Sequence, residues 1–235
     1  MFLQDEPQRY LFDLPRTFDI GAVFFFAVTG AMVAVKRGYD YVGLFAMSFI
    51  SGLGGALIRD GIFLQEGPPG LTRDGRYLIA VLVGCVVGWI LGLRLERFQR
   101  PIALIDAVGL GTYGIYGTCR SLAVGLSYPA AVLVGVINAC GGGLLRDVVT
   151  REEPLLLKPG QFYVLASLLG CIAFVLLTLH TPLSTGLAAW VAICATVVFR
   201  VLSIQFNWRT RPLKGGWRLH GSGRPPAEPP TTVAK

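Results

Sequence analysis

The segment GGALIRD at residues 54–60 returns as GGGLLRD at residues 141–147, an offset of 87 residues. The same offset aligns residues 19–60 with residues 106–147 without a gap, with ten identities in 42 positions. After a one-residue shift the match continues, because an offset of 86 pairs Tyr77 with Tyr163, Ala80 with Ala166, Gly84 with Gly170 and Cys85 with Cys171. The chain therefore contains a long internal repeat.

The composition around this repeat indicates a membrane protein. Apolar residues make up 53% of the 235 residues and charged residues only 15%, against roughly 25% charged in soluble domains. Apolar runs long enough to cross a bilayer recur along the chain, and helices are the spanning form that fits their length. We predict spans at Phe18 to Val35, Tyr41 to Ile58, Tyr77 to Leu93, Ile102 to Cys119, Tyr128 to Leu145, Phe162 to Leu179 and Leu183 to about Ile204.

Each repeat contains three predicted spans, so the second copy enters the membrane from the opposite face. The predicted fold is an all-α membrane protein with seven transmembrane helices, comprising two inverted three-helix repeats and a seventh helix. Arg200 near the end of the last span is expected to snorkel to the interface. The predicted segments are an external amino-terminal segment (1–17), the first repeat (18–93), the second repeat (102–179), the seventh helix (183–206) and a disordered basic cytoplasmic tail (207–235).

The distribution of basic residues predicts the orientation. Six Lys and Arg residues lie on the side of the amino terminus and fifteen on the other side. Because cytoplasmic segments are enriched in Lys and Arg, we expect the amino terminus outside and the carboxyl terminus in the cytoplasm. The net charge of +7 is thus a topology signal and does not indicate nucleic-acid binding. The basic tail either contacts anionic lipid headgroups or only anchors the topology.

Two glycine-rich segments occupy equivalent positions in spans two and five. A glycine pair permits a kink, and a kink releases carbonyl oxygens that need a donor, water or an ion. In a pore, such carbonyls and nearby polar side chains replace part of a cation's hydration shell. Close helix packing through small residues is the alternative, and the sequence leaves both open. The candidate pathway and kink residues are Ser51, Gly54, Gly55, Asn138, Gly141, Gly142 and Gly143.

An Arg–Asp pair follows each glycine segment, and each arginine shares a helix face with the glycine four residues before it. Each arginine either reaches an aqueous path or anchors its helix at the interface. Asp19 and Asp106 near the start of each repeat suit a helix amino terminus. Antiparallel neighbours also bring them beside the arginines, so we predict the pairs Asp19–Arg59 and Asp106–Arg146. The candidate gating network is Asp19, Arg59, Asp60, Asp106, Arg146, Asp147 and Arg120; the position equivalent to Arg120 is Val33.

Other sequence features argue for packing and against chemistry. Gly84, Gly88 and Gly92 recur every four residues, which predicts a contact face with another helix or subunit. The five cysteines lie within apolar spans without metal-ligand spacing. Nucleotide-binding, serine-hydrolase and metalloprotease patterns are missing, so we expect neither enzymatic activity nor a cofactor.

The doubled motif, the Asp-led repeats and the three-plus-three-plus-one layout resemble bacterial members of the trimeric intracellular cation (TRIC) channel family. Their repeat unit is also known as the glycine transporter domain, and the resemblance covers residues 15–204. It implies a homotrimer whose protomers each have a potassium-permeable, less selective pore lined by kinked second and fifth helices. It further implies a prokaryotic plasma (inner) membrane, with potassium or sodium ions, membrane lipids and other copies of the chain as partners. The inositol-lipid motif of the animal branch is not visible, so lipid and calcium regulation are not carried over.

A second function fits the same sequence. Inverted repeats with broken helices also suit alternating access, so a secondary transporter of a small zwitterion such as glycine remains the alternative. A non-conducting membrane scaffold is a third class, although it leaves the repeated polar residues without a role.

Overall fold

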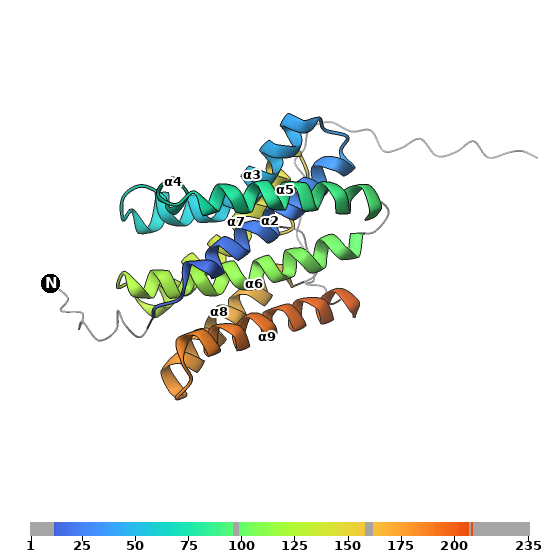
Figure 1. Cartoon of the computed structure of the whole chain (residues 1–235). Helices are drawn as coiled ribbons and strands as arrows, with labels where there is room; N and C mark the ends of the chain where they lie inside the picture. Colours follow the sequence, from blue (N-terminus) through green and yellow to red (C-terminus); the bar gives the residue numbers. More distant parts are fainter. Residues whose placement is uncertain (1–11, 96–98, 158–161, 207, 209–235) are drawn as a thin grey trace, which may run out of the picture.

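The computed structural model describes residues 12–95, 99–157, 162–206 and 208. Within these ranges, seven helices are long and apolar enough to cross a membrane, and the predicted all-helical fold is confirmed (Figure 1). Most of the predicted external segment and nearly all of the predicted tail lie outside the described residues. The helices are α2 (Arg16–Lys36), α3 (Tyr41–Ile58), η1 (Arg59–Leu64), α4 (Gly70–Arg73), α5 (Arg76–Leu95), α6 (Gln99–Ala123), α7 (Tyr128–Val149), α8 (Tyr163–His180) and α9 (Thr185–Gln205).

The first helix of each repeat lies at the centre of its half. Helix α2 packs against α3 and α5, and α6 packs against α7 and α8. Helices α2 and α6 contact each other, as do α3 and α7, while α9 covers α6 and α8. Figure 1 shows α2 between α5 and α6, with α9 at the lower edge. The two repeats are thus joined through their first and second helices.

The helix ends repeat as closely as the helices. Gly38 after α2 and Gly125 after α6 have positive φ angles of 69° and 90°, which glycine adopts at little cost. In both repeats the backbone amide of the residue after this glycine bonds a carbonyl oxygen of the helix. The amide of Tyr39 donates to the carbonyl of Ala34 at 3.1 Å, and the amide of Leu126 donates to the carbonyl of Ser121 at 3.0 Å. The internal repeat is therefore a repeat of backbone geometry.

The change of offset from 87 to 86 has a structural cause. In the first repeat α3 continues as the π-helical segment η1, whereas α7 remains α-helical to Val149. A π-helical turn holds one more residue than an α-helical turn, so the extra residue is accommodated within the helix. Beyond it, Gln65 and Arg151 end the two helices with similar left-handed φ angles of 50° and 56°.

The glycines of spans two and five form a close helix crossing between α3 and α7. A Cβ atom at Gly55 would overlap the carbonyl oxygen of Asn138, and one at Gly142 would overlap that of Ser51. Both helices stay α-helical through these glycines. The glycines allow the two backbones to approach each other, as the packing interpretation expects.

The glycine face of α5 also packs within the chain. Cβ atoms at Gly84 and Gly88 would meet the backbone of α2, and one at Gly92 would lie 2.9 Å from Val35. The predicted helix contact is confirmed, and its partner is α2. This face is consequently buried inside the protomer and cannot serve as a contact between subunits.

Candidate functional site

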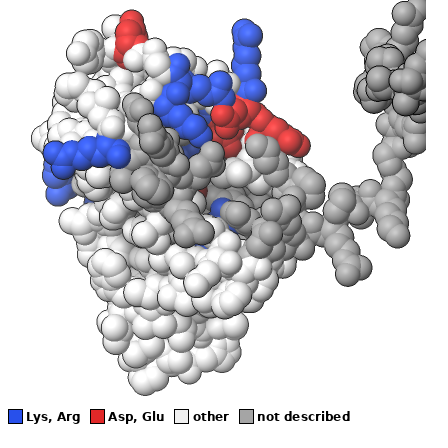
Figure 2. Space-filling view, turned by 90° about the vertical axis from the view of Figure 1, so that its right-hand side faces the viewer, with Lys and Arg blue, Asp and Glu red and all other residues white. Residues whose placement is uncertain are grey.

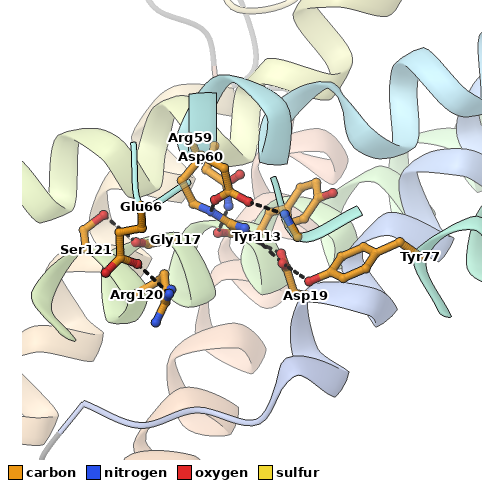
Figure 3. Close-up of polar contacts among 11 residues, drawn as sticks. Asp19, Arg59, Asp60, Glu66, Tyr77, Tyr113, Gly117, Arg120 and Ser121 are labelled. Atoms are coloured by element: carbon orange, nitrogen blue, oxygen red, sulfur yellow. Dashed lines mark hydrogen bonds and ion pairs between the residues drawn. The ribbon is translucent and has the colours of Figure 1, made fainter. Parts of the chain in front are cut away.

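A buried ion-pair network lies where α2 begins and α3 ends (Figure 3). Arg59 donates two hydrogen bonds to Asp19, at 2.9 and 3.0 Å, and one to Asp60, at 2.7 Å. Tyr77 donates to Asp19 at 2.6 Å, and the guanidinium lies 5.1 Å from the ring centre of Tyr116. The side chains of Asp19 and Arg59 are only 1% and 3% exposed, so the predicted pair is present and is shielded from solvent.

The second repeat contains the corresponding network. Arg146 donates to Asp106 at 3.2 Å and to Asp147 at 3.0 Å. It also contacts the hydroxyl of Thr29 at 3.4 Å. The arginine side chain is 5% exposed, which excludes its role as an anchor at the membrane interface.

Each network connects the two repeats in the same way. Arg59 of the first repeat stacks on Tyr116 of α6, and Arg146 of the second repeat bonds Thr29 of α2. Thr29 and Tyr116 are themselves related by the offset of 87 residues. One constellation is therefore built twice, at opposite ends of the bundle, and each arginine holds the first helix of the other repeat.

The second network differs from the first around Tyr163. Tyr77 donates to its aspartate, whereas the hydroxyl of Tyr163, the equivalent residue, has no hydrogen-bond partner among the described residues. Arg200 of α9 lies 5.0 Å above the Tyr163 ring and is 2% exposed. The expectation that Arg200 snorkels to the interface was wrong, because its guanidinium makes a cation–π contact with the Tyr163 ring of α8 inside the bundle.

Polar groups also meet at the centre, between the two networks. Phe26 and Tyr113, which are equivalent in the two repeats, stack with ring centres 5.4 Å apart. The Tyr113 hydroxyl donates to Gly52 at 2.5 Å, and the Asn138 amide donates to Tyr113 at 2.7 Å. Two equivalent side-chain oxygens, Ser51 Oγ and Asn138 Oδ1, are buried without a partner in the described parts of the chain.

A cavity of about 520 Å³ leads to the first network. Asp19, Arg59 and Tyr77 line it together with Arg120 and Glu66. Arg120 donates to Glu66 at 2.5 Å, and Figure 3 shows this pair apart from the Asp19–Arg59 contacts. The cavity thus has a buried charged floor and an ion pair between exposed side chains.

The structure groups the predicted residues into three sets. Asp19, Arg59 and Asp60 form the first network, and Asp106, Arg146 and Asp147 form the second. The glycine segments with Ser51 and Asn138 form the crossing between them, where all seven candidate pathway residues are buried. Arg120 joins neither network, because its partner is Glu66.

Sequence reasoning missed the aromatic and hydroxyl members of the networks. Tyr77 and Tyr163 were visible as a repeated identity, which was the available signal for their shared role. Tyr116 and Thr29 are chemically different residues at equivalent positions, so the repeat gave no sign of them. The partners of Arg120 and Arg200 come from segments distant in the sequence.

These observations define the class of protein. Seven membrane-spanning helices, inverted repeats and buried charges at both ends describe an integral membrane protein with polar groups along its core, the architecture of transport proteins. The family model described as Glycine transporter matches residues 16–92 and 103–179, one match for each repeat. The chain belongs to this family.

Curated relatives agree with this assignment. The chain is 32% identical to the UPF0126 membrane protein YvgT of Bacillus subtilis over 187 residues, which cover 78% of this chain and 89% of the relative. It is 30% identical to the UPF0126 inner membrane protein YadS of Escherichia coli over 194 residues, which cover 80% of this chain and 91% of the relative.

Solved structures show the same fold. The TRIC trimeric intracellular cation channel orthologue from Rhodobacter sphaeroides matches with a TM-score of 0.71 and 30% identity, covering 81% of this chain and 96% of that one. A second TRIC cation channel structure matches with a TM-score of 0.73 and 27% identity, covering 87% of this chain and 99% of that one. The resemblance to TRIC channels drawn from the sequence is therefore confirmed.

Proposed function

We propose that this protein is a cation channel, with a pathway in each protomer at the crossing of α3 and α7. The observation that carries the proposal is the repeated order of groups along this crossing. A buried Arg–Asp network lies at each end. Between them lie the oxygens of Ser51 and Asn138, which have no hydrogen-bond partner among the described residues. Such oxygens are the ligands that replace water around a permeating cation.

The acids of the first network outnumber its single arginine. Two carboxylates, Asp19 and Asp60, surround the single guanidinium of Arg59. The formal sum of these three groups is negative, whereas the lining of the whole cavity carries four acids and four arginines. We propose permeation by potassium or sodium ions, as the resemblance drawn from the sequence implies.

The arginines are the proposed gating groups. Arg59 and Arg146 each form ion pairs with two acids, Asp19 and Asp60 for the first and Asp106 and Asp147 for the second. Opening then requires a guanidinium to exchange its carboxylate partners, together with bending of α3 and α7 at Gly55 and Gly142. Arg120 is proposed to act at the cavity mouth.

Assembly and orientation complete the proposal. The structural neighbours named above are described as trimeric channels, and we propose that this chain also forms a homotrimer. From the basic asymmetry we propose that the amino terminus lies outside and the tail in the cytoplasm, in a prokaryotic plasma membrane. The domain division into two repeats, a seventh helix and two terminal segments is part of the same proposal.

Measurement of ion flow in a defined membrane tests the function. Purified protein in planar bilayers should give unitary potassium currents, and proteoliposomes should release potassium without added substrate. The alternative is a transporter of a small zwitterion, which the family description and the charged cavity of about 520 Å³ favour. Saturable glycine uptake without unitary currents would establish that alternative and exclude the channel.

A further inference from the structure

Two ion pairs outside the buried networks connect the repeats. On the side of the amino terminus, Glu66 follows η1 of the first repeat and binds Arg120 in the last turn of α6 of the second. At the opposite end, Glu152 follows α7 of the second repeat and binds Arg37, which caps α2 of the first. Each pair therefore joins the first helix of one repeat to the loop after the second helix of the other.

The two acids are equivalent positions of the repeat. Glu66 and Glu152 are separated by 86 residues, the offset that applies beyond the π-helical segment. Each follows a residue with left-handed backbone geometry, Gln65 with φ 50° and Arg151 with φ 56°. The same turn, adopted by non-glycine residues at a cost in backbone energy, thus directs both glutamates.

The two arginines are related by one helical turn. The position equivalent to Arg120 is Val33, and Arg37 lies four residues beyond Val33 on the same face of the helix. The two arginines therefore make the same connection between the repeats, from positions that differ by one helical turn. A chance surface contact would not be expected at both ends with matching acids and matching helix faces.

The location of the first pair indicates what it controls. Glu66 and Arg120 line the cavity whose floor is formed by Asp19 and Arg59, and Figure 3 shows the pair beside that floor. Figure 2 shows Lys/Arg and Asp/Glu side chains gathered on one part of the surface at the other end of the bundle. The pair of Arg37 and Glu152 joins the carboxyl end of α2 to the segment after α7. Both pairs lie outside a buried arginine network.

We propose that these ion pairs are two latches that hold the two ends of the cation pathway closed. Breaking the Glu66–Arg120 latch lets the loop after η1 separate from α6 and widens the entrance to Asp19 and Arg59. Breaking the Arg37–Glu152 latch releases the loop after α7 from α2 in the same manner. The proposal rests on the pathway described above, and it adds a separate closing contact at each membrane face.

The energetics suit a latch. Side-chain exposures of 44% and 36% for Arg120 and Glu66, and of 36% and 51% for Arg37 and Glu152, place both pairs in contact with water. Such pairs are weak and are screened by salt. They shift an open–closed equilibrium by about two- to fivefold, whereas the buried networks would resist such small changes.

The native thiol of Cys119 permits a test that does not depend on ion currents. Cys119 lines the cavity next to Arg120 and is 1% exposed. In full-length protein with the other four cysteines replaced by alanine, the modification rate by a cationic methanethiosulfonate reagent reports the opening of this entrance. Glu66→Gln should raise that rate by about two- to fivefold. The lost negative charge would by itself slow a cationic reagent, so an increase reports opening.

Matched variants separate the latch from a general effect of charge. Glu152→Gln and Glu153→Gln should leave Cys119 modification at the reference rate, because they act at the other end. The exchange Glu66→Arg with Arg120→Glu should return the rate toward the reference. Without any substitution, raising salt from about 0.05 M to about 1 M should speed the modification.

The outcomes distinguish this proposal from the channel proposal. An unchanged Cys119 rate in both Glu66→Gln and Glu66→Arg, or a charge exchange that restores nothing, overturns the latch whatever the currents show. Absence of potassium currents from every protein, including the unsubstituted one, overturns the channel, while the Cys119 rates still decide on the latch. If both proposals hold, Glu66→Gln and Glu152→Gln each raise open probability about two- to fivefold.

Discussion

Replacement of Arg59 by glutamine should destabilise the protein strongly. Arg59 provides three hydrogen bonds to two carboxylates, and its side chain is only 3% exposed. After Arg59→Gln, the donor that Asp19 keeps among the described residues is the Tyr77 hydroxyl at 2.6 Å. Removing one partner of a buried pair leaves the other charge without compensation and costs about 3–5 kcal/mol.

Arg120→Gln is the matched control, because Arg120 also pairs with an acid but is 44% exposed. Its loss should cost about 0–1 kcal/mol. Unfolding in a mixed-detergent titration, followed by tryptophan fluorescence, measures both variants. Asp19→Asn combined with Arg59→Gln should recover part of the lost stability, because the uncompensated charge is then removed. A free energy of unfolding for Arg59→Gln within about 1 kcal/mol of that for Arg120→Gln would refute the reasoning.

Three further predictions follow from packing and charge. Gly88→Leu should destabilise the protomer by about 1–3 kcal/mol or more, because its Cβ would meet the α2 backbone; a trimer that dissociates into stable protomers in size-exclusion chromatography would contradict this. Gly142→Ala should lower potassium flux from proteoliposomes through overlap with the Ser51 carbonyl at the crossing, while the control Gly21→Ala, which has open space, should keep the original flux. A cysteine at Ser222 should react with an impermeant reagent only after the cells are permeabilised, and labelling in intact cells would reverse the proposed orientation.

The helices and the pairing of charges could be predicted from the sequence because they depend on the length of the apolar runs and on the antiparallel arrangement of adjacent helices. Apolar runs of membrane length define the spans, and the repeat places Asp19 and Arg59 on adjacent antiparallel helices. The equivalent argument applied to Asp106 and Arg146. Such pairs follow from topology alone, and the structure confirms them.

The glycine segments could not be interpreted from sequence because glycine permits both bending and close approach. The structure shows a close approach of α3 to α7 at Gly55 and Gly142. The one-residue shift was visible, but its location within η1 required the backbone. The alignment pairs Arg120 with Val33, so it did not identify Arg37 as the counterpart of Arg120. Arg37 lies one helical turn beyond Val33 on the same helix face.

The conductance of Ser51→Ala tests the proposed pathway most directly. Ser51 Oγ is buried without a hydrogen-bond partner among the described residues, so its removal breaks no contact that stabilises the fold. If this oxygen is a ligand for permeating potassium, single-channel recording of Ser51→Ala should show reduced unitary conductance with unchanged thermal stability. Unitary conductance and selectivity equal to those of the unsubstituted channel would contradict a pathway along the α3–α7 crossing.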